Sequence, residues 1–175
     1  MNLVSLVFGV MAVLMETGPD ASAADLKACR VNINRMESGS LKIVLENTSD
    51  EPISYIDSLS TSRRVPAFLF FEILGIDEAA QERIEQISLN ERESNVISTT
   101  DLATIAPKDK VVRIVDGKLI GDLVRDYFVQ RPAANTSHTL IRFFITVAAD
   151  PKLENRISAR SPVYPVATVI RWERK

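Results

Sequence analysis

The stretch over residues 40–56, SLKIVLENTSDEPISYI, constrains the fold more than any other part of the chain. From Leu41 to Leu45 every second residue is a core-forming aliphatic one, and this period of two predicts a β-strand with one face on a core. Residues 47–52 then break the strand, because short polar side chains hydrogen-bond their own backbone and the proline has no N–H for a ladder. A second short strand is expected over residues 53–56. This unit indicates a β architecture and says little about chemistry.

The first 23 residues have the form of a secretory signal peptide. Residues 3–15 carry no charge, a polar patch follows, and residues 21–23 end in a small-x-small pattern. We therefore expect export and cleavage between Ala23 and Ala24. The segment before the apolar run lacks Lys and Arg, which leaves a buried or disordered N-terminus as the alternative. The apolar run is also too short to span a bilayer, which takes about 20 residues.

The charge balance of the chain excludes a strong long-range attraction for polyanions. The 175 residues include 21 Lys and Arg and 23 Asp and Glu, and loss of Glu16 and Asp20 with the leader makes the two numbers equal. A neutral chain with mixed signs has no basic field for nucleic acid or an anionic membrane. We expect residues 24–175 to form a single domain with no nucleic-acid partner and no stable membrane span.

Cys29 is the only cysteine, so no intramolecular disulfide can form. Its setting, LKAC over residues 26–29, is similar to the bacterial lipoprotein cleavage box, in which the cysteine is lipidated. Lys27 is unusual in that box, and the apolar run ends well upstream. We favour a small apolar side chain on the inner face of a first strand over residues 28–36. A turn containing Gly39 would join this strand to the next as a hairpin.

The remaining alternating or apolar runs predict further strands. Residues 67–74 are apolar at both odd and even positions, which is typical of a strand covered on both faces. Residues 166–173 alternate as a terminal strand would, with Trp172 as an anchor in the core or at its rim. Further strand candidates cover residues 102–105, 111–115 and 139–149. A polar stretch follows through Ser161.

Helical patterns are rarer. Residues 76–90 fit either a short helix capped by Asp77 or a strand returning over residues 83–89, and we favour the strand because it would pair with the one before it. One stronger pattern predicts a single short helix near residues 118–128. The apolar residues on its one face are Ile120, Leu123, Val124, Tyr127 and Phe128.

Seven to nine short strands with turns between them predict a mainly β fold, an antiparallel sandwich with that one helix. The Asn-Thr-Ser-Asp-x-Pro turn between two strands, followed by an Ala-Pro-Lys-Asp turn at residues 106–109, resembles exported immunoglobulin-like modules such as BsuPI-type proteinase inhibitors. The resemblance covers residues 41–115 and the closing strands, and it implies an immunoglobulin-like binding module rather than an enzyme. Lys108 stands where those modules usually have glycine after the proline.

The chain offers few groups for catalysis or metal binding. One His and one Cys do not make a zinc site, although carboxylate and carbonyl oxygens could hold calcium. His138 and Ser137 are neighbours, so on a strand they would point to opposite faces. No strained nucleophile elbow and no glycine-rich phosphate loop is present, and we expect no cofactor. Glu72 is the one acid in an apolar strand, and burial would raise its pKa unless it pairs with Arg142 or Arg171.

We therefore expect an exported, non-catalytic binding or interaction protein whose partner is another protein. The first alternative is an inhibitor or immunity-type protein that blocks an exported hydrolase through the loop over residues 58–66, where Arg63 and Arg64 lie side by side. The second alternative is a carboxylate-dependent hydrolase built around Glu72. Edge strands of a sandwich permit either self-pairing or the addition of a partner strand, so the oligomeric state stays open.

Overall fold

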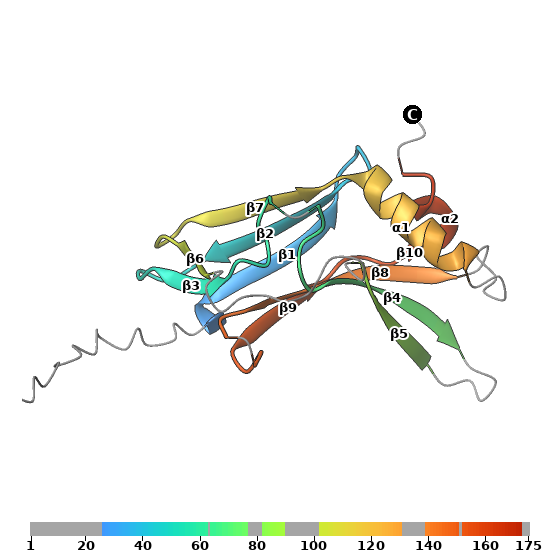
Figure 1. The fold of residues 1–175 in the computed structure, drawn as a ribbon. Helices are drawn as coiled ribbons and strands as arrows, with labels where there is room; N and C mark the ends of the chain where they lie inside the picture. Colours follow the sequence, from blue (N-terminus) through green and yellow to red (C-terminus); the bar gives the residue numbers. More distant parts are fainter. Residues whose placement is uncertain are drawn as a thin grey trace, which may run out of the picture.

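The computed structural model describes residues 26–62, 64–76, 82–89, 102–130, 139–150 and 152–172. They form an antiparallel β-sandwich in which a three-stranded sheet lies over a five-stranded one, with a helix at one end between the two sheets (Figure 1). The prediction of a mainly β, antiparallel sandwich with a helix near residues 118–128 is confirmed; the described residues form ten strands, against the seven to nine predicted, and a second short helix.

The three-stranded sheet has the order β1-β2-β7. Its strands are β1 (Cys29–Arg35), β2 (Leu41–Asn47) and β7 (Lys110–Val115). The expected hairpin of the first two strands is confirmed, and Gly39 in its turn has a φ of +85°, which favours glycine. A short 3₁₀ turn, Leu26–Ala28, leads into β1.

The five-stranded sheet has the order β10-β8-β4-β5, with β9 also paired to β8. Its strands are β4 (Leu69–Ile76), β5 (Glu82–Ser88), β8 (Leu140–Ala148), β9 (Arg156–Arg160) and β10 (Tyr164–Pro165). The returning strand favoured within residues 76–90 is confirmed as β5, which pairs with β4. The polar stretch before Ser161 contains β9, an edge strand with charged residues at alternate positions, which the sequence pattern did not indicate.

A third, two-stranded sheet joins β3 (Ile53–Ile56) to β6 (Leu102–Ile105). β6 and β7 are neighbours in the chain but belong to different sheets. The turn over residues 106–109 leads from the two-stranded sheet to the three-stranded one. Lys108 in this turn has a φ of +58°, the left-handed conformation that glycine adopts most easily.

The N-cap of helix α1 (Gly117–Val129) is Asp116, whose carboxylate accepts the N–H of Leu119 at 3.0 Å. Its buried face includes Ile120, Val124 and Phe128, as the sequence predicted. In the described ranges no helix is long and apolar enough to cross a membrane.

The terminal strand predicted over residues 166–173 is wrong. Val166–Val169 form the short helix α2, which follows Pro165 and is continued by a hydrogen bond from the Trp172 N–H to the Val169 carbonyl. Val166, Val169 and Trp172 are buried at a spacing of three, so helical spacing and strand alternation both fit the same letters. The prediction that Trp172 anchors the core is confirmed, since it packs on Phe143 at 5.5 Å between ring centroids.

Candidate functional site

The outer face of the five-stranded sheet carries the residues that stand out chemically. Along β4 and β8, alternation sends Phe71 and Phe143 into the core and turns Phe70, Glu72 and Phe144 to the opposite face. In Figure 1 no other labelled element lies below this sheet. The sequence predicted that residues 67–74 are covered on both faces, but the outward Phe70 is only half-buried.

Strand register arranges this face in three rows, which we name by their side chains. The aromatic row holds Phe70 on β4 opposite Phe144 on β8, and Arg160 on β9 lies in the same row beyond Phe144. The hydroxyl row holds Thr146 on β8 opposite Ser158 on β9, two residues further along each strand. The arginine row, two residues further again, holds Arg156 on β9. Adjacent rows are about 7 Å apart, because a strand rises about 3.4 Å per residue.

A hollow of about 310 Å³ crosses all three rows. Its size is at the lower end of the range for sites that hold small ligands or single side chains of a partner. The rings of Phe70 and Phe144 are 6.1 Å apart and tilted by 39°, so they form an apolar floor. The residues lining it are Phe68, Phe70, Gln86, Phe144, Thr146, Leu153, Arg156 and Ser158.

The polar groups in the hollow differ in how many hydrogen bonds and ion pairs they already make within the protein. The hydroxyls of Thr146 and Ser158 are 3.1 Å apart, so one donates to the other and the second O–H can donate to a ligand. Arg156 is exposed and makes no hydrogen bond or ion pair to any residue that the structure describes. Arg160 differs, because its guanidinium stacks over the Phe144 ring at 4.6 Å and is tied to a carboxylate.

That carboxylate is Glu72, which is 1% exposed and lies beside the aromatic row. It accepts hydrogen bonds from Arg142 Nε, from Arg160 Nε at 3.2 Å and from Gln86 Nε2 at 3.0 Å. Burial by itself raises the pKa of Glu72, but the hydrogen bonds from Arg160, Arg142 and Gln86 outweigh it and hold the pKa below its usual value. Burial without a cation, the condition under which the pKa of Glu72 was expected to rise, is therefore not met. The pairing with Arg142 is confirmed, and Arg160 is the second cation rather than Arg171.

Two residues that line the hollow hold strained backbone. Phe68 and Leu153 both have a φ of +59°, which costs a residue with a side chain about 1–2 kcal/mol relative to the right-handed region. The Leu153 turn is organised by Asp150, whose carboxylate accepts the N–H of Lys152 at 2.8 Å and of Asn155 at 2.7 Å. These backbone hydrogen bonds lower the pKa of Asp150. Strain of this kind, when it gathers around one hollow, is typical of a functional site.

The loop predicted as a contact lies apart from the hollow. Arg63 lies outside the described residues, and Arg64 is exposed. Leu59 and Val65 are buried on either side, and the carbonyl of Arg64 accepts a hydrogen bond from Arg113 Nη2 at 3.3 Å. The loop is therefore anchored at both ends and exposed at its tip.

Several other predicted residues fall outside the described ranges. They are Ala23 and Ala24 at the expected cleavage site, and Ser137 and His138. Cys29 is half-buried on β1 and packs against the core, as favoured from the sequence, and burial raises the pKa of its thiol. Among the described residues no group of three or more His, Cys, Asp or Glu gathers where it could hold a metal.

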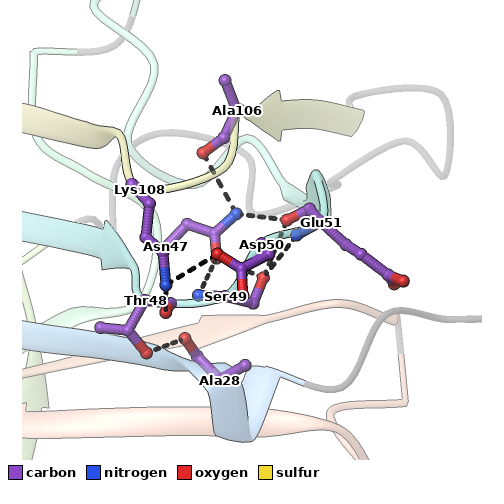
Figure 2. Close-up of polar contacts among 8 residues, drawn as sticks. All are labelled: Ala28, Asn47, Thr48, Ser49, Asp50, Glu51, Ala106 and Lys108. Atoms are coloured by element: carbon purple, nitrogen blue, oxygen red, sulfur yellow. Dashed lines mark hydrogen bonds and ion pairs between the residues drawn. The ribbon is translucent and has the colours of Figure 1, made fainter.

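The turn over residues 47–49, whose Asn-Thr-Ser sequence matches the N-glycosylation acceptor motif, is structural (Figure 2). Asn47 is fully buried, and its Nδ2 donates to the carbonyls of Glu51 at 2.7 Å and Ala106 at 3.1 Å. Its Oδ1 accepts the N–H of Ser49 at 2.9 Å. Lys108 Nζ reaches across to the carbonyl of Thr48 at 2.7 Å. Both the Nδ2 and the Oδ1 of this buried amide are engaged in hydrogen bonds that join two turns, so Asn47 is not an accessible acceptor for a glycan.

Comparison with protein-family models finds no match for this chain, and comparison with curated protein sequences finds none either. Among solved structures it is similar to the X-ray structure of Northeast Structural Genomics Consortium target SoR45, with 10% sequence identity over 78% of this chain and 84% of that one. The TM-score is 0.26, which is too low to support a shared fold.

Proposed function

We propose that this chain is an exported, non-catalytic binding protein that holds another protein at the outer face of its five-stranded sheet. The observation that carries the proposal is the hollow, in which an aromatic floor, two hydroxyls and an arginine without a described partner lie together. Aromatic and arginine side chains are the residues that most often dominate binding energy at protein interfaces. Export rests on the leader-like residues 1–23.

The charge of this face favours an acidic partner. Glu72 supplies one negative charge, whereas Arg142, Arg156 and Arg160 supply three positive ones. Two of the arginines neutralise Glu72 and remain partly exposed, and Arg156 keeps its full capacity for a carboxylate. A carboxylate and a guanidinium form two parallel hydrogen bonds, which gives both affinity and orientation.

A photo-crosslinking experiment tests this proposal. A benzophenone amino acid placed at Glu154, which is exposed and follows the lining residue Leu153, is expected to capture a partner when the full chain is expressed in its own host. The same amino acid at Asn32, exposed on the outer face of β1, should capture far less of it. Arg156→Glu in the Glu154 variant should abolish capture, whereas Lys152→Glu, a nearby exposed lysine outside the hollow, should not. Equal capture at both positions, or capture insensitive to Arg156→Glu, would contradict the proposal.

The second candidate function is inhibition of an exported hydrolase through the loop that carries Arg64. Its support is the anchored base and exposed tip of this loop, a shape suited to insertion into a partner's cleft. The benzophenone amino acid at Ser62, which is exposed in the tip, tests it. Capture of a hydrolase at Ser62 and not at Glu154 would favour this candidate over the first.

A further inference from the structure

The three rows of the outer face follow one another in a chemical order. The aromatic row comes first, the hydroxyl row second and the arginine row third, with steps of about 7 Å along β8 and β9. All three rows line one hollow. A ligand that lies along β8 therefore meets an apolar surface, then a hydrogen-bonding pair, then a cation.

We propose that the hollow binds the C-terminal end of a peptide chain whose third side chain from the end is apolar; this inference rests on the proposed function. The apolar side chain packs on Phe70 and Phe144, the last peptide group meets the hydroxyls of Thr146 and Ser158, and the terminal carboxylate pairs with Arg156. An extended chain advances about 3.3–3.6 Å per residue, so two residues match one row step. The long side chain of Arg156 lies in the lining and shortens the remaining distance.

The peptide group fits the hydroxyl row because that row can both donate and accept. One of the two hydroxyls donates to the other, so the pair offers a free O–H to a peptide carbonyl and lone pairs to a peptide N–H. Gln86 lines the same hollow, and its Nε2 is held by Glu72, so its amide is fixed in place. A site that is rigid before binding loses little entropy when a ligand arrives.

The carboxylate fits Arg156 because, among the described residues that line the hollow, Arg156 is the one with a charged side chain. Arg160 and Arg142 are both committed to Glu72, so the anion of a ligand is directed to the opposite end of the hollow. Phe68 and Leu153 add two apolar side chains to the lining of the hollow. The site therefore distinguishes the two ends of a ligand.

Titration calorimetry with short peptides tests this assignment on the full chain. N-acetyl-Phe-Gly-Gly with a free carboxylate is the probe, and its C-terminal amide is the matched control. Loss of a charged hydrogen bond weakens binding about tenfold or more, so we expect at least this difference between acid and amide. Arg156→Gln should bind the two equally, and Lys152→Gln should retain the preference for the acid.

Three outcomes would overturn the assignment. Equal binding of acid and amide to the unmodified chain would show that the site does not recognise the terminal carboxylate. Binding of 3-phenylpropanoate as tightly as the peptide acid would identify a small apolar acid, and not a chain terminus, as the ligand. Failure of every probe while the Glu154 crosslink still captures a partner would reject the ligand class and leave the proposed function standing. Loss of that capture would instead reject the proposed function.

Discussion

Asn47 joins two turns that are far apart in the chain. Its amide nitrogen donates to Glu51 within its own turn and to Ala106 in the turn between β6 and β7, while its amide oxygen accepts from Ser49. The residue is fully buried, so water cannot replace any of these bonds. The amide is needed because only a side chain with both a donor and an acceptor satisfies all three partners.

Asn47→Asp is expected to lower the free energy of unfolding by about 2–4 kcal/mol. Aspartate keeps the acceptor for Ser49 but loses the donor, and it places a carboxylate against two carbonyl oxygens. Urea denaturation followed by circular dichroism measures the change. Asp50→Asn in the same turn is the control, because its ion pair with Lys108 is exposed and contributes about 1 kcal/mol or less. Equal effects of the two substitutions would show that the buried amide is not what holds the turns together.

At the scale of elements, two glycines set how closely α1 approaches its neighbours. A Cβ at Gly117 would lie 2.7 Å from the carbonyl carbon of Gly39 in the β1–β2 turn. A Cβ at Gly121 would lie 3.1 Å from the carbonyl oxygen of Val169 in α2. In the sequence these glycines belong to no phosphate loop. In the structure they have a packing role, because the backbones they face have no room for a side chain.

Gly117→Ala is expected to destabilise the protein although alanine favours helix by about 1 kcal/mol. The added methyl group overlaps the Gly39 backbone, and overpacking of this kind costs about 1–3 kcal/mol. A fall in Tm on thermal denaturation measures the net effect. Lys118→Ala, one position further along and exposed, should change Tm very little. A Tm for Gly117→Ala at or above that of the unmodified chain would mean that the turn moves aside freely.

The elements predicted best from the sequence are those whose own pattern decides them. β2, β3, β8 and α1 carry strong periodicity, and each lies within a residue or two of its predicted range. α2 was mistaken for a strand because Val166, Val169 and Trp172 satisfy both periods, and tertiary packing decided between them. β9 was missed because an edge strand keeps only one modestly apolar face.

The candidate site was harder to predict, because it depends on register between distant strands. The pairing of Glu72 with Arg142 was within reach, since a buried acid needs a cation. The rows were not, because a single sequence does not reveal that Phe70 lies opposite Phe144 or Thr146 opposite Ser158. The usable signal was phenylalanine on both parities of the strand over residues 67–74. Apolar residues on both faces of a strand also fit one that is covered on both sides, and the sequence alone does not distinguish the two cases.

At the scale of the whole molecule, Glu72 links four strands of one sheet. It lies on β4 and accepts hydrogen bonds from Gln86 on β5, Arg142 on β8 and Arg160 on β9. The sheet therefore carries a charged cluster across its width, next to the hollow. Removing the carboxylate would leave two guanidinium groups close together without their counter-ion.

This cluster predicts acid sensitivity with a definite sign. The pKa of Glu72 is lowered in the folded state from its ordinary value of 4.5, so as pH falls below that value the unfolded chain takes up the proton first. The stabilisation by Glu72 is thus complete above about pH 4.5 and is lost as pH falls through the lowered folded pKa. Asp150, whose pKa is also lowered, contributes in the same direction.

Glu72→Gln should lower stability at pH 7 and flatten its decline below pH 4.5, because the substituted side chain has no proton to take up. Urea denaturation from pH 7 to pH 3 measures both effects. Asp150→Asn is the matched comparison, since it removes a titrating group from the Leu153 turn and leaves the cluster between the strands intact. If the free energy of unfolding of Glu72→Gln falls with pH in parallel with that of the unmodified chain, protonation of Glu72 does not cause the loss of stability in acid. Another titrating group would then be responsible.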